Sequence, residues 1–246
     1  MIPEIVSNNL ASLQPGRVRY ARTCWMEFSA EGIPIGAEVE RSAIKSCRRF
    51  TYEEVDVFLA DPQTRAVEMT DSVRELLGRM RDLARILRAR RTARGSLELV
   101  MPEVKIDLDR DGRVSGAHVV ENTESHKIIE EFMLSANEAV AERLARAGAG
   151  FLRRIHPSPD LRKLRQLTEF VTELGFEVDS LESRFELQRL LVMTRGRAEE
   201  HAVHYAVLRS LTRAAYGPQE DGHFALASDC YCHFTSPIRQ IGRAHV

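Results

Sequence analysis

The polar side chains best spaced for chemistry lie in residues 124–147, where apolar residues recur every three or four positions, as in an amphipathic helix. Projecting this helix at about 100° per residue places three polar residues in one stripe beside the apolar face: His126, Glu130 and Asn137. Glu131 points nearly opposite, so we expect Glu130 to be the half-buried carboxylate. Such a group can orient a water or a metal-bound group. The alternative is a solvated helix edge.

A second group of hydrogen-bonding side chains lies at the end of a strand-like segment at residues 224–234. It consists of His233, Thr235, Ser236 and Arg239, and Pro237 fixes the turn among them. An arginine just beyond a strand can bind a phosphate through two parallel hydrogen bonds and stabilise charge that develops there. The alternative is a strand end with a solvent-exposed arginine.

An acidic run at residues 107–112 imitates the start of a calcium loop. Asp107, Asp109 and Asp111 alternate before Gly112, but the twelfth position is His118 instead of a bidentate glutamate. An Asp-Gly pair between alternating segments is itself a strong hairpin signal. The other histidines and the four cysteines also lack zinc-ligand spacing, so we expect no metal ligands in this chain.

The elements that must position these groups are segregated strands and helices. Alternating patterns predict antiparallel strands at residues 20–28 and 35–42 and a hairpin of residues 97–108 and 114–120. Helices are expected at residues 51–61, with a Thr51–Glu54 capping box, and at residues 70–91, with most arginines on the exposed face. Residues 151–156 are expected to be extended, and two or three helices to fill residues 160–215. This order predicts an α+β fold.

The composition allows a folded chain but does not by itself indicate a partner. The 246 residues are 43% hydrophobic, enough for a sizeable core, and the formal net charge is -1. Seven arginines against one acid between Arg79 and Arg94 nevertheless predict a local basic surface. No apolar run approaches the ~20 residues that cross a membrane. We expect a soluble cytoplasmic protein with reduced cysteines.

Several segments, in order, resemble the catalytic domain of the ribonuclease II / ribonuclease R (RNB-domain) family of 3′→5′ exoribonucleases, in a ribonuclease R-like form. The similar strings are MIPEIVSNNLASLQP, RFTYEEV, RGSLEL, SHKIIEEFMLSAN, FLRRIH and, most specifically, HFTSPIR. The resemblance covers residues 1–239. It implies a partial RNB catalytic domain with antiparallel strands packed against several helices.

The resemblance also implies an activity, namely hydrolysis of single-stranded RNA from its 3′ end to nucleoside 5′-monophosphates. Family members hold a pair of magnesium ions in an aspartate cluster, and such ions activate water and neutralise the scissile phosphate. That cluster precedes the matched region, so we expect the Mg²⁺ ligands upstream of Met1 and the isolated chain to be inactive. The full-length form is expected to be a cytoplasmic monomer that degrades RNA without a membrane partner.

Position by position, the resemblance implies roles for individual residues. Glu130 matches the supporting active-site carboxylate and Arg239 the phosphate-contacting arginine. Tyr52 matches an aromatic position beside the RNA, where stacking contributes about 1–3 kcal/mol per base, although an ordinary capped helix start would look the same. Leu99 stands where many relatives have a phenylalanine, and it offers no π-face. The other RNA-binding candidates are His126, Asn137, His233, Thr235 and Ser236.

Two further interpretations concern the end of the chain and the class of protein. Residues 240–246 depart from the family pattern and match one reading frame of a common sequencing adapter, so we interpret them as a non-native tail. A competing hypothesis is a non-catalytic RNA-binding RNB-like scaffold or regulatory protein, which would lack the upstream aspartate cluster. A third is an unrelated α+β structural protein.

Overall fold

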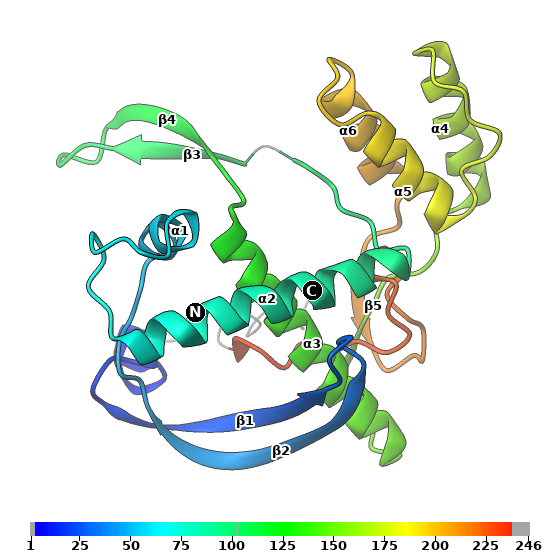
Figure 1. Ribbon diagram of the computed structural model, residues 1–246. Coiled ribbons are helices and arrows are strands. Elements are labelled where there is room, and N and C mark those ends of the chain that lie inside the picture. The colour runs from blue at the N-terminus through cyan, green and yellow to red at the C-terminus, as the bar shows by residue number, and fades with distance from the viewer. Residues whose placement is uncertain (1–2, 102, 238–246) are drawn as a thin grey trace.

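The computed structural model describes residues 3–101 and 103–237. Arg239 and the tail at residues 240–246 lie outside the described residues, so the interpretations of them stay predictions. Two long helices, α2 (Asp71–Ala93) and α3 (Glu124–Arg146), cross in the middle of the molecule above a curved two-stranded ribbon (Figure 1). A bundle of shorter helices stands apart at one end (Figure 1).

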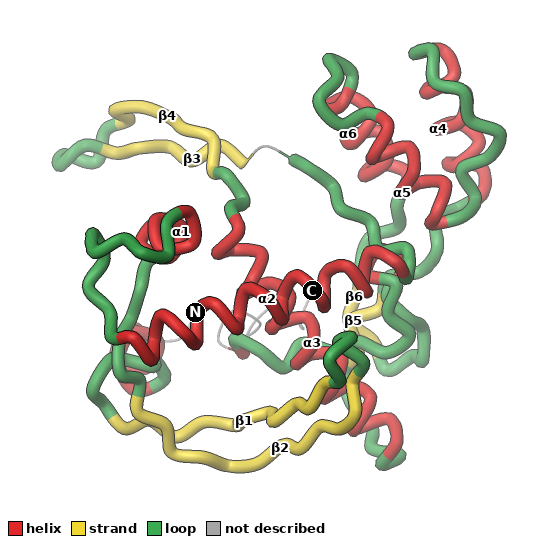
Figure 2. Tube along the Cα trace, viewed as in Figure 1, coloured by secondary structure: helices red, strands yellow, loops and turns green. Residues whose placement is uncertain are grey.

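The remaining elements are helices and strands shorter than α2 and α3, and the strands pair antiparallel (Figure 2). The other helices are α1 (Tyr52–Ala60), α4 (Leu161–Glu173), α5 (Arg184–Met193), α6 (Glu200–Ser210), a π-helix at Ile5–Leu10 and a 3-10 turn at Phe224–Leu226. Within the described residues, the strands form three antiparallel pairs: β1 (Val18–Phe28) with β2 (Pro34–Lys45), β3 (Glu103–Leu108) with β4 (Val114–Val120), and β5 (Arg153–Ile155) with β6 (Ala215–Gly217). The predicted α+β class is confirmed.

Local sequence signals explain where several elements begin and turn. The Thr51 hydroxyl accepts a hydrogen bond from the Glu54 N–H at 3.2 Å, and the Glu54 carboxylate accepts one from the Thr51 N–H at 2.7 Å, so the capping box is confirmed. Gly112 has φ +77 in the β3–β4 hairpin turn, where a side chain would be strained. Asp109 serves that turn by accepting from the backbone N–H groups of Asp111 and Arg113.

Helix α3 is the central element of the part of the molecule outside the α4–α6 bundle, because it contacts α1, α2, β1 and β2. Its residues Val140 and Ala141 pack with Cys232 from the end of the chain into one hydrophobic core. A second core joins α4, α5 and α6 and includes Leu97 from the segment after α2. None of the described helices is long and apolar enough to span a membrane.

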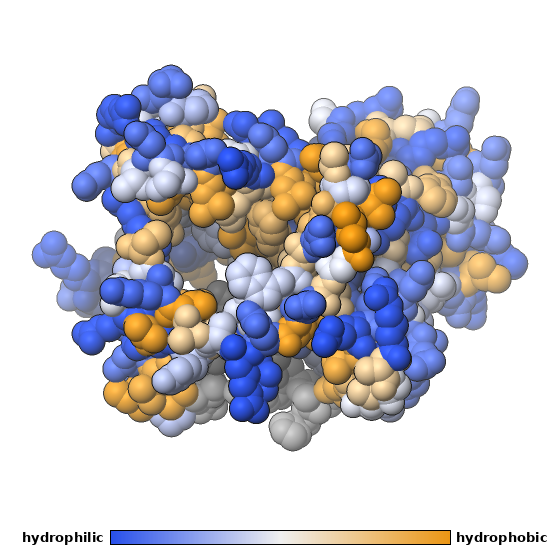
Figure 3. Space-filling model, turned by 60° about the horizontal axis from the view of Figure 1, so that its bottom comes forward, coloured by the Kyte–Doolittle hydropathy of each residue, from blue (hydrophilic) through white to orange (hydrophobic). Residues whose placement is uncertain are grey.

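The curved ribbon of β1 and β2 leaves apolar side chains at the surface. In the view that brings this side of the molecule forward, hydrophobic residues lie between hydrophilic ones (Figure 3). Tyr20 and Trp25 of β1 and Ile35 of β2 are each exposed. Alternate residues of β1 are better covered, which is the period-two pattern of a strand with one face toward the core.

Two predicted strands were wrong in extent or kind. The strand expected to begin at Leu97 begins only at Glu103, because the Leu97 N–H bonds to the carbonyl of Ala225 and the Val100 N–H bonds to His204 Nδ1. These bonds to loop and helix groups replace a strand partner.

The strand expected at residues 224–234 does not form. The segment contains the 3-10 turn, and Ala227 has φ +52, a left-handed conformation that interrupts an extended chain. The Tyr231 carbonyl accepts one hydrogen bond from the Arg154 N–H of β5. Tertiary contacts therefore decide the path of this segment.

Candidate functional site

A cavity of about 450 Å³ lies among α1, α3 and the segment at residues 231–236. It brings together every predicted site residue within the described ranges, from positions far apart in the sequence. The lining residues are Tyr52, Asn122, His126, Ile129, Glu130, Met133, Leu134, Asn137, Tyr231, His233, Thr235 and Ser236. The polar stripe of α3 therefore faces the segment that carries the second predicted group.

Asn137 fixes the wall of this cavity. Its side chain is almost fully buried, and its amide group donates to the Tyr231 hydroxyl at 2.9 Å. Its carbonyl oxygen accepts from the backbone N–H groups of Phe234 and Thr235 at 2.9 and 3.0 Å, and from the Thr235 hydroxyl at 3.2 Å. This amide holds the 231–236 segment against α3, so its geometry is that of a positioning residue.

Tyr52 and His126 form a flat aromatic pair at the cavity. Their ring centroids are 3.7 Å apart and the ring planes meet at 18°. His126 Nδ1 lies 2.7 Å from the Thr123 hydroxyl, which fixes the ring at the first turn of α3. Tyr52 is 42% exposed, so a planar ligand can reach it. Such a surface suits stacking with a nucleobase or another planar group.

His233 of the 231–236 segment belongs to a polar cluster with Arg154 and Tyr216. Its Nδ1 contacts the hydroxyl of Tyr216, and the Arg154 guanidinium lies 3.3 Å from both His233 Nε2 and the Tyr216 hydroxyl. Because arginine only donates, His233 Nε2 is the acceptor in its contact with Arg154. Nearby, burial raises the pKa of the Tyr231 phenol, so this group stays protonated.

The helical projection was wrong about which glutamate of α3 is buried. The Glu131 side chain is 3% exposed, whereas that of Glu130 is 44% exposed at the cavity. The projection assumed one apolar face, but α2 covers the opposite side of α3 and supplies a cation there. Arg91 Nε lies 3.1 and 3.2 Å from the two Glu131 oxygens, so the buried carboxylate is paired.

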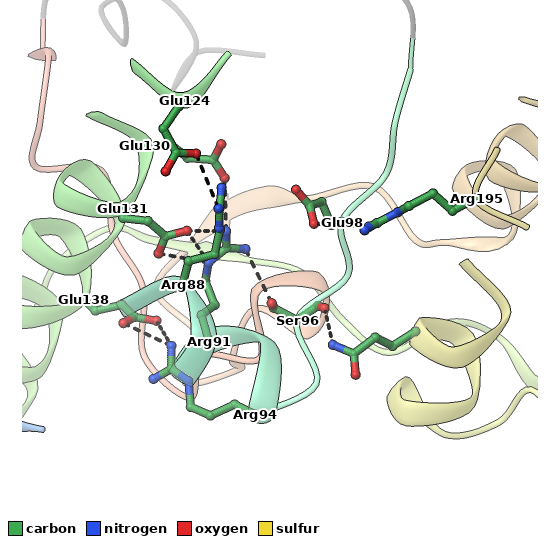
Figure 4. A network of polar contacts seen from close by, with 11 residues as sticks. Arg88, Arg91, Arg94, Ser96, Glu98, Glu124, Glu130, Glu131, Glu138 and Arg195 are labelled. Carbon is green, nitrogen blue, oxygen red and sulfur yellow. Dashed lines mark hydrogen bonds and ion pairs between the residues drawn. The ribbon is translucent and has the colours of Figure 1, made fainter. Parts of the chain in front are cut away.

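Arg91 is itself an exception to the prediction that the arginines of α2 face solvent. Its guanidinium is buried and also contacts Ser96 Oγ and Glu130 Oε1, each at 3.4 Å (Figure 4). Burial disfavours the charged form, but the Glu131 hydrogen bond and the charges of Glu131 and Glu130 outweigh it, so the pKa of Arg91 is raised. The Arg91 guanidinium therefore stays protonated and positively charged.

Comparison with known proteins decides the family. The RNB domain model matches residues 1–241. Ribonuclease R of Aquifex aeolicus is 37% identical over 245 residues, which are 98% of this chain and 34% of that protein. The chain belongs to the RNB-domain family. It spans about a third of the length of this relative and of ribonuclease R from Thermotoga maritima.

Solved structures share the RNB fold. Mycoplasma genitalium RNase R, in complex with ribose-methylated single-stranded RNA, superposes with a TM-score of 0.88 at 28% identity, over 96% of this chain and 37% of that one. Yeast Ssd1, described as a pseudonuclease, gives a TM-score of 0.70 at 20% identity over 96% of this chain and 29% of that one. The second likeness shows the fold alone.

The magnesium pair implied by the RNB resemblance does not fit the described residues alone. In residues 3–101 and 103–237, no three His, Cys, Asp or Glu side chains group as a metal site. The acidic run of the β3–β4 hairpin is engaged otherwise, since Asp107 lies 3.0 Å from His118 Nδ1. Among the described residues that line the RNB cavity, Glu130 alone brings a carboxylate.

Sequence reasoning missed two residues: Tyr231, which lines the cavity, and Arg91, which contacts Glu130 at its edge. Arg91 follows Ala84 and Leu87, both buried, at spacings of seven and four, so the period of α2 could have placed it on the inner face. Tyr231 carries no such signal, because its segment has no regular structure. Its position depends on Asn137 of α3.

Proposed function

We propose that this chain is the RNB segment of a longer 3′→5′ exoribonuclease that hydrolyses single-stranded RNA to nucleoside 5′-monophosphates. The observation that carries the proposal is the convergence of Tyr52, His126, Glu130 and the 231–236 segment on one cavity. Relatives named ribonuclease R and the Mycoplasma complex with RNA support it. The protein would act in cytoplasmic RNA turnover.

In this proposal the aromatic pair binds the RNA and Glu130 serves the reaction. A base stacks on Tyr52, which reads no sequence because every base has a π-face. The Glu130 carboxylate orients the attacking water or a ribose hydroxyl as a hydrogen-bond acceptor. Ser236 has φ +50, which turns the chain sharply just before Arg239, the predicted phosphate ligand outside the described residues.

Magnesium enters the proposal as a cofactor whose ligands lie outside the described residues. When bound, such ions activate water and neutralise charge on the phosphate. The residues of this chain provide the surroundings: an aromatic surface, one carboxylate and the wall fixed by Asn137.

The test compares the 246-residue chain with the full-length protein on a 5′-labelled single-stranded oligoribonucleotide in Mg²⁺. We expect the chain to bind this RNA, measured by fluorescence anisotropy, but to release no mononucleotides. The full-length protein should shorten the RNA from its 3′ end and release nucleoside 5′-monophosphates, detected by chromatography.

A second candidate function is a non-catalytic RNA-binding scaffold, because the pseudonuclease Ssd1 has the same fold. If the full-length protein binds RNA but releases no mononucleotides in Mg²⁺, the exoribonuclease proposal is wrong and the scaffold function takes its place. Failure to bind RNA at all would reject both functions.

A further inference from the structure

Arginines of the second half of α2, together with Arg94 at its C-terminal end, face glutamates of α3 where the two helices cross, and the two signs of charge are not paired one to one; Figure 4 shows Arg88, Arg91 and Arg94 of this row. Arg85 and Arg88 share Glu124 at 2.8 and 3.5 Å, and Arg94 has Glu138 at 3.1 Å. Arg91, between them, contacts two carboxylates, Glu130 and Glu131. The four arginines and four glutamates of the row balance, but Arg85 and Arg88 share one carboxylate whereas Arg91 alone meets two. The local excess of negative charge is therefore at Arg91, where Glu130 lines the cavity.

We propose that Arg91 and Glu131 are positioning residues for Glu130: Arg91 orients the Glu130 carboxylate, and Glu131 takes up the charge of Arg91 so that Glu130 is not locked in a full ion pair. The proposal rests on the exoribonuclease function proposed above and deepens it. A guanidinium without Glu131 would pair with Glu130 directly, and the paired carboxylate would be a weaker base.

Rigidity supports the orienting role of Arg91. Its Nε and Nη2 are held by Glu131 and its Nη1 by Ser96, so the whole planar group is fixed in one direction. Ser96 follows Gly95, which has φ +90 and whose Cβ position would lie 3.2 Å from Phe185, so the turn after α2 is closely packed. The half-exposed Glu130 carboxylate therefore accepts from an Arg91 guanidinium that its other hydrogen bonds hold in place.

Stability alone does not explain this buried pair. Desolvating two charges opposes burial, and apolar residues of similar volume often replace such pairs without loss. The neighbouring pair of Arg94 and Glu138 is more exposed, and neither residue is among the described residues that line the cavity. Among the described arginines of α2, Arg91 is the one that contacts a carboxylate at the cavity.

The experiment compares Glu131→Gln with the control Glu138→Gln in the full-length protein. The first substitution keeps the shape of the side chain and a hydrogen bond to Arg91 but leaves the charge of Arg91 free to pair with Glu130. One charge at close range in water is worth about 1 kcal/mol, so the labelled single-stranded RNA should bind roughly three- to tenfold more tightly. The turnover number should fall at least about tenfold, as for a weakened general base.

Glu138→Gln removes the same charge from the same helix away from the cavity, so binding and turnover should each stay within about twofold of wild type. Equal behaviour of the two variants would overturn the inference. If wild type binds RNA but releases no mononucleotides, the proposed catalytic function fails, whereas the affinity difference between the variants still decides the charge arrangement. Absence of RNA binding by wild type rejects both.

A second variant covers the case in which circular dichroism shows that Glu131→Gln is unfolded. Arg91→Met with Glu131→Met removes one charge of each sign and leaves Glu130 unoriented. RNA affinity should then stay within about twofold because the net charge is unchanged, while the turnover number falls at least about tenfold. Wild-type turnover in this double variant contradicts the orienting role of Arg91.

Discussion

At the scale of single residues, neighbours decide what a side chain can do. Glu130 and Glu131 are adjacent in the sequence, yet one lies at the cavity and the other is buried against Arg91. Asn137 has the type of a ligand-binding amide, but its hydrogen bonds are made to the protein. Tyr52 differs from both, because part of its ring is open to solvent.

Tyr52→Ala should weaken the binding of single-stranded RNA. Loss of one stacked base costs about 1–3 kcal/mol, which corresponds to about a 5- to 150-fold rise in Kd. Fluorescence anisotropy with the 246-residue chain measures the change. Tyr205→Ala is the control, because Tyr205 is 48% exposed on α6 and does not line the cavity. Equal losses for both variants would remove Tyr52 from the RNA site.

At the scale of elements, α3 joins the parts that make the cavity. Its first turn carries His126 against Tyr52 of α1, its middle carries Arg91's partners toward α2, and Asn137 binds the 231–236 segment. The last segment has no ladder of backbone partners among the described residues, so the amide of Asn137 replaces one. The cavity therefore depends on one side chain for one of its walls.

Asn137→Ala should destabilise the chain by about 2–6 kcal/mol, because two backbone N–H groups lose their acceptor and each unsatisfied donor costs roughly 1–3 kcal/mol. Urea unfolding followed by circular dichroism gives the free energy of unfolding. Asn122→Ala, an exposed residue of the same cavity, should change it by less than about 0.5 kcal/mol. A similar small effect for Asn137→Ala would show that the wall is held by other contacts.

At the scale of the whole molecule, the chain between residues 222 and 234 connects the two cores. Phe224 packs against the α4–α6 core, and Cys232 belongs to the core of α3. Next to Phe224, the ring of His223 meets the ring of His156 edge to face, with ring centroids 4.8 Å apart. Burial and the neighbouring His156 and Arg154 lower the pKa of His223 to about 3, and burial lowers that of His156.

The connection between the cores should therefore be sensitive to acid. An unfolded histidine has a pKa of about 6.5, so below that pH the unfolded chain binds protons. The folded His156 and His223 rings do not bind them there because their pKa values are lower. The free energy of unfolding should fall as the pH falls from about 6.5 toward 3, by up to about 1.4 kcal/mol per pH unit for each histidine. Urea unfolding at a series of pH values measures this slope.

His223→Asn should make the slope shallower, since one buried group no longer titrates. The control His201→Asn, on the exposed side of α6, should leave the slope unchanged. An unchanged slope in His223→Asn would mean that other groups cause the acid sensitivity.

The sequence by itself determined the local elements, because their signals act over a few residues. The capping box of Thr51, the Asp-Gly turn, the β1–β2 pair and the helices after residue 160 all appear where caps, turns and periodicity predict them. The resemblance to the RNB-domain family is of the same kind, since it is carried by short strings in a fixed order.

Only the tertiary structure decided which polar side chains meet and which are buried. The periodicity of α3 assumes a single covered face, whereas α2, α1 and the ribbon of β1 and β2 cover this helix from several sides. A second covered face buries Glu131, and that burial is tolerated because Arg91 arrives from another helix. The path of residues 224–234 is likewise set by hydrogen bonds to distant groups, which no local pattern encodes.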